Sequence, residues 1–504
     1  MSKKKSPFRG KSGGSSGGSS GGSSGGNSGG NSGGNSGGGN GGNTGARSGA
    51  RNGGGQRGGR SSARGAGRAA APAGVIGHIA TLLDTVLRFD TPADAAVSAY
   101  FRANPGLGQR ERGEVAEAVF AVLRRKLEFA HLAESGAGSQ LRRLALLGLA
   151  ATQSPARVAG MLGEEEAGWL DRLRGIDRAS LSPALRDNLP DWFSAALDAR
   201  LGPQRREALA QAMLQGAPLD LRVNLVKSSR ESVLQILQTA GVAAAPTPYS
   251  PVGIRLEGKP ALNRFELFNE GAIEVQDEGS QLLCCLVAPR RGEMVVDFCA
   301  GAGGKTVALG AMMRNSGRLY ALDVSEKRLA RFKPRLSRSA LSNVHPVLID
   351  SELDPKLKRM AGKADRVLVD APCSGLGTLR RNPDLKWRQS PAKVAEMTVK
   401  QASILAAAAK LVKPGGRLVY ATCSLLPEEN QQIVDAFLAA HPQFARLDAG
   451  ALLREARIPL EMGQGLELLP DTHLTDGFYA AVMQREAAAG APQGEDAAVE
   501  AEQD

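Results

Sequence analysis

The chain has 504 residues with 63 Lys and Arg against 51 Asp and Glu, which gives a net charge of +12. Residues 1–70 hold 11 of the basic residues and no acidic one, so the remaining chain has 52 basic and 51 acidic groups. An apolar share of 42% is sufficient for buried cores and excludes a wholly disordered protein. The sequence therefore predicts a basic tail followed by a nearly neutral body of about two to four domains.

The cysteines, the histidines and the hydropathy exclude several classes of protein. The 5 Cys and 5 His are scattered and form no Cys-x-x-Cys pair, which argues against a disulfide framework and against a structural zinc site. No apolar segment reaches the roughly 18 residues of a membrane-spanning helix, and no apolar segment of a secretory signal follows the charged N-terminus. We therefore expect a reduced, cytoplasmic protein without a metal ion.

The two ends of the chain have the composition of disordered segments. Residues 1–72 contain Gly-Gly-Ser-Ser and Gly-Gly-Asn-Ser repeats followed by scattered Arg, and residues 487–504 are acidic and rich in Ala. Such segments bury too little apolar surface to fold, so we predict two disordered tails. The basic tail either attracts RNA phosphate loosely or serves only as a solubilising extension, and both interpretations stay open.

Residues 73–165 have the pattern of an all-helical domain. Apolar residues recur at three- and four-residue spacing from Val75 to Leu87, and residues 115–123 and 141–151 form two further helical runs. We predict a helical domain of an RNA-binding kind. Its basic cluster at residues 124–126 either faces RNA or is a solvated helix end.

Residues 166–266 mix helical and extended patterns. Helical stretches fall around 192–214 and 230–240, whereas 221–224 and 253–256 have the pattern of short strands between Pro-rich loops. We predict a small α+β module in this part of the chain.

From residue 267 to residue 486, apolar strands alternate with helices. The sequence predicts strands at 294–298, 318–323, 344–349, 366–370 and 417–422, and a helix at 394–411 that is ended by Pro414-Gly415-Gly416. This alternation favours an α/β fold with a parallel sheet covered on both faces. Ligands of such sheets bind at the carboxyl ends of the strands, and four of the five predicted strands end in, or run into, an Asp or Cys.

A glycine-rich turn, Gly301-Ala302-Gly303-Gly304, follows the first of these strands. Two phosphate-binding motifs are excluded, because a P-loop would need Gly where Cys299 stands and a dinucleotide fingerprint would need Gly or Ala at Thr306. Glycine lets a backbone adopt positive φ and approach a ligand closely. A compact turn of this kind after an acidic strand end, here Asp297, is typical of sites for S-adenosylmethionine (SAM).

The second and third strands support this prediction because each leads into an acidic residue. Asp323 lies 26 residues after Asp297 and can accept hydrogen bonds from both ribose hydroxyls of an adenosyl group. Asp350 would then lie beside the adenine ring. Any one of these acids could simply cap a helix, but three successive strands that end alike favour a cofactor site.

Two cysteines, Cys373 and Cys423, come directly after the fourth and fifth strands and therefore belong to the same edge of the sheet. A thiol there can act as a nucleophile where neighbouring charges favour the thiolate. Carbon 5 of a pyrimidine is too weak a nucleophile to accept a methyl group, but addition of a thiolate to carbon 6 makes it reactive. Two cysteines fit one nucleophile and one helper in this reaction.

Five segments make the chain similar to a known family. They are residues 297–306, 370–377, 381–387, 421–424 and 475–479. On these segments the chain resembles the NOL/NOP/Sun family of RNA cytosine-5 methyltransferases, most closely the bacterial Sun (Fmu) type that acts on small-subunit ribosomal RNA. The similarity extends over residues 218–486 and continues more weakly into the helical domain.

The resemblance implies a Rossmann-like SAM-dependent methyltransferase sheet with a reversed final strand at 478–484. It makes Cys423 the nucleophile that bonds covalently to the cytosine, and Cys373 the residue that assists release of the methylated RNA. It also places Asp370 between the cofactor and the target base, and Lys305 near the cytosine and the cofactor carboxylate. The target base must be flipped out or single-stranded, because carbon 6 is inaccessible in a stacked helix.

The resulting hypothesis is a monomeric RNA (cytosine-5)-methyltransferase whose expected substrate is small-subunit ribosomal RNA. Transfer RNA is an alternative substrate, and a ribosome assembly factor with incidental methylation is an alternative of a different class. The catalytic residues would be Cys423 and Cys373. The cofactor-binding residues would be Cys299, Ala300, Gly301, Ala302, Gly303, Gly304, Lys305, Asp323, Asp350 and Asp370.

The glycine turn departs from the Ala-Pro-Gly-Gly of the family at two positions, because Gly301 and Ala302 stand where the family usually has Ala and Pro. The loss of Pro makes the turn more flexible, which would weaken cofactor binding without abolishing it. Segment 276–280 also differs slightly from the Gln-Asp-x-Ser of the family. Both cysteines are present, so we expect an active enzyme.

Overall fold

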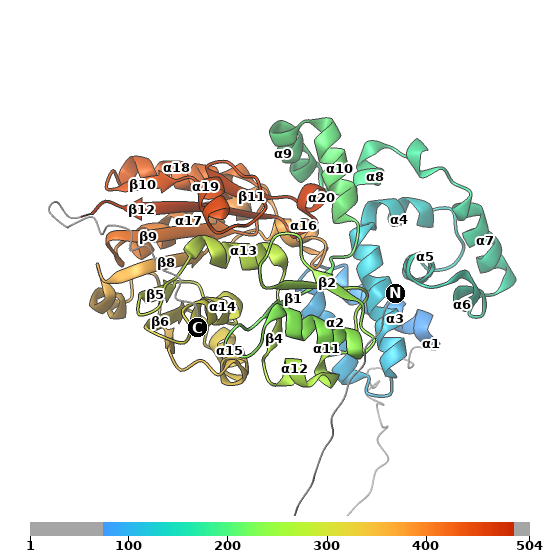
Figure 1. Ribbon diagram of the computed structural model, residues 1–504. Coiled ribbons are helices and arrows are strands. Elements are labelled where there is room, and N and C mark those ends of the chain that lie inside the picture. The colour runs from blue at the N-terminus through green and yellow to red at the C-terminus, as the bar shows by residue number, and fades with distance from the viewer. Residues whose placement is uncertain (1–73, 488–504) are drawn as a thin grey trace, which may run out of the picture. The chain divides into compact units, whose positions relative to one another are not determined.

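The computed structural model of the chain describes residues 74–487 (Figure 1). The disorder predicted for residues 1–72 and 487–504 falls outside the described residues except at Ala487, and it stays a prediction. All described residues belong to one compact unit. Within this described range, no helix is long and apolar enough to cross a membrane.

The N-terminal part of the described chain is helical, as the sequence predicts. Apolar residues of α1 (Gly74–Val86), α3 (Gln109–Arg124) and α5 (Gln140–Thr152) pack together in one core. Ser139 begins α5, because its hydroxyl accepts a hydrogen bond from the amide of Arg142 and so satisfies a free donor of the first turn. The further helices here are α2 (Ala93–Ala103), α4 (Lys126–Ala133), α6 (Pro155–Ala159), α7 (Glu164–Arg174), α8 (Pro183–Asp187), α9 (Asp191–Leu201) and α10 (Pro203–Met213).

A four-stranded antiparallel sheet with the strand order β2-β3-β1-β4 follows these helices. The elements of this small module are β1 (Leu219–Val223), α11 (Arg230–Thr239), β2 (Ala244–Pro246), β3 (Gly253–Leu256), α12 (Glu266–Asn269) and β4 (Ile273–Val275). Val233 and Leu237 of α11 pack on the sheet. β4 pairs with β1 of this module although it lies beyond residue 266. The domain boundary placed at residue 266 from the sequence stays a prediction.

The C-terminal part contains an eight-stranded sheet with the order β10-β12-β9-β8-β5-β6-β7, in which β11 pairs with β12. The pairs from β9 to β7 are parallel, whereas β12 runs antiparallel to β9, β10 and β11. The α/β sheet with a reversed final strand is thereby confirmed. Its strands are β5 (Met294–Asp297), β6 (Arg318–Asp323), β7 (Val344–Leu348), β8 (Ala364–Asp370), β9 (Val412–Thr422), β10 (Phe444–Leu447), β11 (Gly465–Leu468) and β12 (Phe478–Arg485).

Helices cover both faces of the large sheet, which explains the almost continuous apolar strands (Figure 1). Val295 belongs to the core under α13, α14 and α15, and the next residue, Val296, belongs to the core under α17 and α18. Successive side chains of a strand point to opposite faces, so each strand supplies both cores. The helices of this part are α13 (Glu278–Val287), α14 (Gly304–Met312), α15 (Glu326–Ser339), α16 (Leu385–Arg388), α17 (Pro391–Ala409), α18 (Gln431–Ala440), α19 (Ala449–Glu455) and α20 (Pro470–His473).

The start of β9 differs from the prediction. The strand begins at Val412 and includes Pro414-Gly415-Gly416, which the sequence analysis assigned to a helix end before a strand at 417. The pairing of β9 with β8 shifts register between Ala364 and Arg366, so the extra residues form a bulge. Gly415, with a φ of 74°, makes this bulge possible.

Arg124, in the basic cluster at 124–126, is half-buried and makes an internal contact, whereas both interpretations of the cluster stay predictions. Its guanidinium donates a hydrogen bond to the Arg380 carbonyl at 3.0 Å, and Lys386 donates to the Arg124 carbonyl at 2.9 Å. The Trp387 indole donates to the Leu123 carbonyl at 2.9 Å. The end of α3 therefore holds the segment that follows Cys373 in the sequence.

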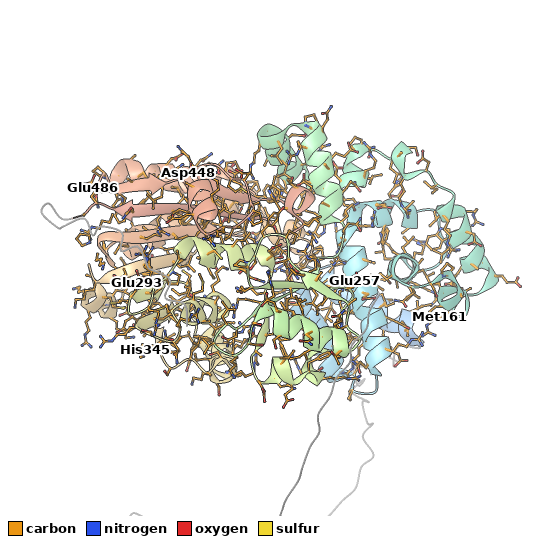
Figure 2. All side chains as sticks on the ribbon, viewed as in Figure 1. Met161, Glu257, Glu293, His345, Asp448 and Glu486 are labelled. Carbon is orange, nitrogen blue, oxygen red and sulfur yellow. The ribbon has the colours of Figure 1, made fainter. Side chains whose placement is uncertain are left out.

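The small module also contacts the helical part. Glu257, at the end of β3, lies toward α3 in Figure 2, and the nearby Lys259 forms an ion pair of 3.9 Å with Glu117 of α3. Both side chains of this ion pair are exposed, so it contributes less than about 1 kcal/mol. The contact identifies a neighbour of the module but does not by itself fix its position.

Candidate active site

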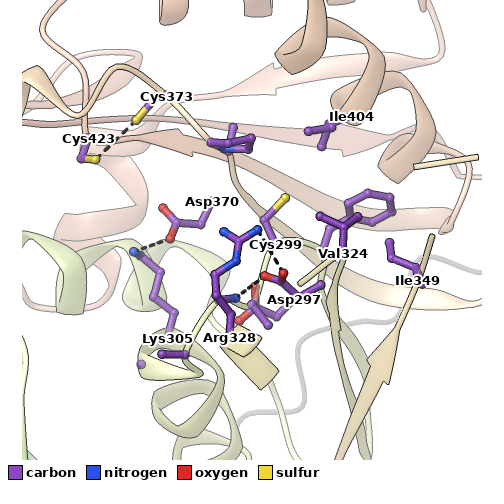
Figure 3. Close-up of a pocket in the computed structure, with 18 of the residues that line it drawn as sticks. Asp297, Cys299, Lys305, Val324, Arg328, Ile349, Asp370, Cys373, Ile404 and Cys423 are labelled. Carbon is purple, nitrogen blue, oxygen red and sulfur yellow. Dashed lines mark hydrogen bonds and ion pairs between the residues drawn. The ribbon is translucent and has the colours of Figure 1, made fainter. Parts of the chain in front are cut away.

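A cleft of about 550 Å3 lies at the carboxyl ends of β5, β6, β7 and β8. Its volume falls within the range of about 300–1,000 Å3 that is usual for small-molecule sites. Cys373 and Cys423 lie at one end of the cleft, Val324 and Ile349 lie at the other, and Asp297 lies between them (Figure 3). The strand ends that the sequence singled out therefore meet in one place.

Asp323 holds the glycine turn in position. Its Oδ2 accepts a hydrogen bond from the Gly301 amide at 2.8 Å, and its Oδ1 accepts one from the Ser325 amide at 2.7 Å. Arg328 forms an ion pair of 3.1 Å with the same Oδ1. An ionised carboxylate has about four acceptor positions, so Asp323 keeps one on Oδ2 for a ligand in the cleft that it lines.

Asp297 presents an unusual carboxylate to the cleft. Its Oδ2 accepts a hydrogen bond from the Thr306 hydroxyl at 2.7 Å, while its buried Oδ1 has no partner among the described residues. Burial raises the pKa of Asp297 to about 7. A buried acceptor without a partner is costly, and a cationic ligand would satisfy it. SAM carries an ammonium and a sulfonium group, so this wall of the cleft fits SAM.

Nine of the ten predicted cofactor-binding residues line the cleft, and Gly303 is the exception. Gly303 lies behind the turn with a φ of 78°, and a Cβ on it would lie 1.9 Å from the ring of Phe332. Its role is therefore to let the turn pack closely on α15. Binding of SAM by the other nine residues stays a prediction.

Lys305 and Asp370 form an ion pair between the turn and the cysteines. The distance from Lys305 Nζ to Asp370 Oδ2 is 2.7 Å (Figure 3), and the Lys305 ammonium lies 5.6 Å from the centre of the Phe478 ring. Burial by itself lowers the pKa of a lysine, but the attraction of Asp370 outweighs it and raises the pKa of Lys305 above its ordinary value. Lys305 is therefore a fixed positive charge at neutral pH.

The two cysteines, 50 residues apart in the sequence, are neighbours in the cleft. The Sγ atoms of Cys373 and Cys423 are 3.4 Å apart (Figure 3). The hydrogen bond with Cys423 and the burial of the group raise the pKa of Cys373 well above its ordinary value. Cys373 is therefore a neutral thiol that can donate a hydrogen bond to the sulfur of Cys423.

A buried carboxylate that the sequence analysis missed joins the two cysteine loops. Glu429 is fully buried and accepts hydrogen bonds from the hydroxyls of Ser374 and Ser424, which directly follow the two cysteines. It also accepts one from the Ser374 amide at 2.8 Å and one from the Gln401 amide group at 3.0 Å. The only sequence signal for Glu429 is its position five residues after Ser424, within a polar Pro-Glu-Glu-Asn run.

Two glycines bring a further segment against the Cys423 loop. Gly377 donates its amide to the Cys423 carbonyl at 2.8 Å, and Gly477 donates its amide to the Gly377 carbonyl at 2.8 Å. A Cβ on Gly377 would lie 2.1 Å from the Gly477 carbonyl oxygen. Gly377 of segment 370–377 and Gly477 of segment 475–479 are therefore required by close backbone approach.

The other three cysteines do not belong to the reactive pair. Cys284 and Cys285 lie on α13 in the core, and burial raises the pKa of each to about 12. Cys299 lines the cleft, but burial raises its pKa strongly as well. Within residues 74–487, no group of three or more His, Cys, Asp and Glu side chains could hold a metal ion.

The fold and the cleft together define a class of protein. A parallel sheet with an antiparallel last strand, and a glycine turn between strand-end acids, is the architecture of SAM-dependent methyltransferases. SAM is accordingly the cofactor of this chain.

Comparison with known proteins identifies the family. The family described as "16S rRNA methyltransferase RsmB/F" matches residues 284–484, and a ferredoxin-like domain of RsmF/B-like methyltransferases matches residues 189–263. The "Probable ribosomal RNA small subunit methyltransferase B" of Synechocystis sp. is 32% identical over 438 residues, which are 80% of this chain and 98% of the relative. The chain therefore belongs to the RsmB/F family of methyltransferases, which confirms the resemblance drawn from the sequence.

Two solved structures are similar as well. The crystal structure of PH0851 matches with a TM-score of 0.67 and 26% identity, over 82% of this chain and 99% of that chain. A methyltransferase homologue from Pyrococcus horikoshii matches with a TM-score of 0.52 and 29% identity, over 60% of this chain and 100% of that chain.

Proposed function

We propose that this chain methylates carbon 5 of a cytosine in small-subunit ribosomal RNA, through a covalent bond between Cys423 and the base. The observation that carries this proposal is the 3.4 Å separation of the Cys423 and Cys373 sulfur atoms in a cleft that also holds the Lys305–Asp370 ion pair. The names of the relatives, which specify small-subunit ribosomal RNA, support the substrate.

Cys423 is the nucleophile in this proposal. A thiolate needs nearby positive charge and hydrogen-bond donors, and the fixed charge of Lys305 and the thiol of Cys373 supply them. Addition of the Cys423 sulfur to carbon 6 of the cytosine forms a carbon–sulfur bond and moves electron density to carbon 5. After methylation, water or another base takes the carbon 5 proton, its bonding pair restores the double bond between carbons 5 and 6, and the carbon–sulfur bond breaks to return the thiolate.

Cys373 assists this last step in the proposal, since its thiol lies 3.4 Å from the sulfur atom whose bond to the base must break. Asp370 has one oxygen on Lys305 and lines the cleft between the turn and Cys373, so its other oxygen is available to hydrogen-bond the amino edge of a cytosine. These positions require a base that is flipped out or single-stranded.

SAM supplies the methyl group in this reaction. The residues that would hold it are the turn from Cys299 to Gly304, with Asp323 toward its ribose, Asp350 toward its adenine and the unpartnered oxygen of Asp297 toward its positive charge.

The test is transfer of labelled methyl groups to small-subunit ribosomal RNA and to transfer RNA, followed by bisulfite mapping of both. We expect one methylated cytosine in the ribosomal RNA, and no transfer with Cys423→Ala. Methylation of transfer RNA alone would overturn the proposed substrate. Full activity of Cys423→Ala would overturn the nucleophile, and ribosome assembly that depends on the chain but not on Cys423 would favour an assembly factor.

A further inference from the structure

The small α+β module contacts the cofactor turn through a buried arginine. Arg222 lies on β1 and is 4% exposed. Its guanidinium donates hydrogen bonds to the Gly304 carbonyl at 2.8 Å and to Gln276 Oε1 at 2.6 Å. Gln276 follows β4 and itself lines the cleft. A residue of the module thus binds the backbone of the turn where α14 begins.

A second arginine reaches the turn from α15 and is held by the same module. Arg335 donates a hydrogen bond to the Ala302 carbonyl at 2.7 Å, and its Nε lies 2.9 Å from a carboxylate oxygen of Glu274. Glu274 lies on β4 directly opposite Arg222 of β1, so both side chains belong to one face of the small sheet. Glu274 is 5% exposed and does not line the cleft.

The turn needs such support because its own sequence does little to rigidify it. Gly301 and Gly303 have φ values of 57° and 78°, and Ala302 stands between them. Glycines lose much conformational freedom when they are ordered, so an unsupported turn would bind a ligand only after it had been ordered. The two carbonyl groups held by Arg222 and Arg335 bracket Gly303 and restrict the turn from both sides.

We propose that the small module is part of the cofactor site: Arg222, and Arg335 as held by Glu274, are positioning residues that pre-organise the turn and so set the affinity for SAM. The module is then required for cofactor binding as well as for any contact with RNA. This inference rests on the cofactor site proposed above.

Arg335 and Arg338 provide a matched pair for the test. Both form ion pairs with Glu274, at 2.9 Å and 2.6 Å, but Arg338 donates no hydrogen bond to the turn and does not line the cleft. Calorimetric titration of the full chain with SAM should give a dissociation constant about tenfold higher for Arg335→Ala. The constant for Arg338→Ala should stay within about twofold of that of the unaltered chain.

Two conservative variants separate support of the turn from other effects. Arg335→Lys keeps the positive charge at the cleft but loses the planar group that binds two partners, so it should also weaken SAM binding. Glu274→Gln should weaken SAM binding several-fold, although Glu274 does not line the cleft. In methyl transfer, Arg335→Ala should raise KM for SAM and leave kcat at saturating SAM and KM for RNA close to normal.

Each other outcome overturns the inference. Unchanged SAM affinity in Arg335→Ala, or equal losses in Arg335→Ala and Arg338→Ala, would show that the turn does not depend on Arg335. Normal SAM affinity in Arg335→Lys would show that the cofactor site needs only a positive charge at this position. Normal SAM affinity in Glu274→Gln would show that the small module does not set the affinity. If the unaltered chain failed to bind SAM, the proposed cofactor site itself would be wrong. If the unaltered chain bound SAM and none of the variants changed the affinity, only this inference would be wrong.

Discussion

Substitution of Glu429 should show whether the positions of the two cysteines depend on its hydrogen bonds or on its negative charge. The group has four hydrogen-bond donors around it. Two of them, the Ser374 amide and the Gln401 side-chain amide, can only donate, and both meet Oε1. The other two are the hydroxyls of Ser374 and Ser424 on Oε2, and a hydroxyl can also accept.

Glu429→Ala leaves the two obligate donors buried without an acceptor. An unsatisfied buried donor costs about 1–3 kcal/mol, so the free energy of unfolding should fall by about 2–6 kcal/mol. The loops of Cys373 and Cys423 also lose their common partner, and a displacement of about 1 Å can lower a rate about 100-fold. We therefore expect the rate of methyl transfer to fall about 100-fold in the molecules that remain folded.

Glu429→Gln should be far milder. The amide oxygen can take the place of Oε1 and keep both obligate donors, while the amide nitrogen donates to the hydroxyls of Ser374 and Ser424, which turn to accept. The added strength of bonds to a charged acceptor is lost, and one of the two hydroxyl hydrogens loses its acceptor, since only one hydroxyl can donate to the other across 3.2 Å. The rate of methyl transfer should stay within about tenfold of normal.

Urea unfolding and single-turnover methyl transfer at saturating RNA and SAM measure the two effects separately. Glu428→Ala is the control, because Glu428 is the exposed neighbour of Glu429. Normal activity and stability of Glu429→Ala would refute the positioning role. If Glu429→Gln were as impaired as Glu429→Ala, the negative charge itself would be needed, and Glu429 would take part in proton transfer.

Three further predictions concern the reaction, the cofactor and the tail. Cys373→Ala should accumulate RNA bonded to Cys423, seen as a shifted band on a denaturing gel, and a band that never shifts would contradict the two-cysteine scheme. Because burial raises the pKa of Asp297 to about 7, its carboxylate is increasingly protonated below that pH, so the dissociation constant for cationic SAM should rise as the pH falls from 8 to 6. Asp297→Asn should bind SAM weakly at every pH in this range. An unchanged pH dependence in that variant would show that Asp297 does not cause the pH dependence of SAM binding. Deletion of residues 1–70 removes 11 positive charges and should weaken RNA binding mainly at low salt, whereas an unchanged salt dependence would make the tail a spacer.

Local pattern was sufficient to predict the sheet and the position of the cleft. A strand buried on both faces is nearly continuously apolar, and its carboxyl end faces the ligand, so Asp297, Asp323, Cys373 and Cys423 could be assigned to one edge from the sequence alone. Short strands such as β10 and β11 were not predicted, because each is too brief to show an alternation of apolar and polar residues. Each of them joins the sheet by pairing with β12.

The residues that hold the site in shape could not be predicted, because they act across long sequence distances. Glu429 joins loops that are 50 residues apart, and Arg222 reaches a turn 82 residues further along the chain. A buried Glu or Arg in the sequence has no local feature that distinguishes it from a surface residue. The contact of Arg124 with the Arg380 carbonyl is of the same kind, because it joins residues 256 positions apart and nothing in the local basic run indicates it.

Arg381 suggests why the chain keeps buried charges near the reaction. Its guanidinium lies 2.9 Å from Asp277, at the start of α13, and 2.6 Å from Asp476, before β12. Such ion pairs add little net stability, because the loss of hydration offsets the attraction. They do fix the distance between the elements that they join. Gly477 follows Asp476 and donates its amide to Gly377, which in turn donates its amide to the Cys423 carbonyl. A shift of Asp476 would therefore be passed through Gly377 to the nucleophile, so the network acts on the geometry of the reaction more than on the stability of the fold.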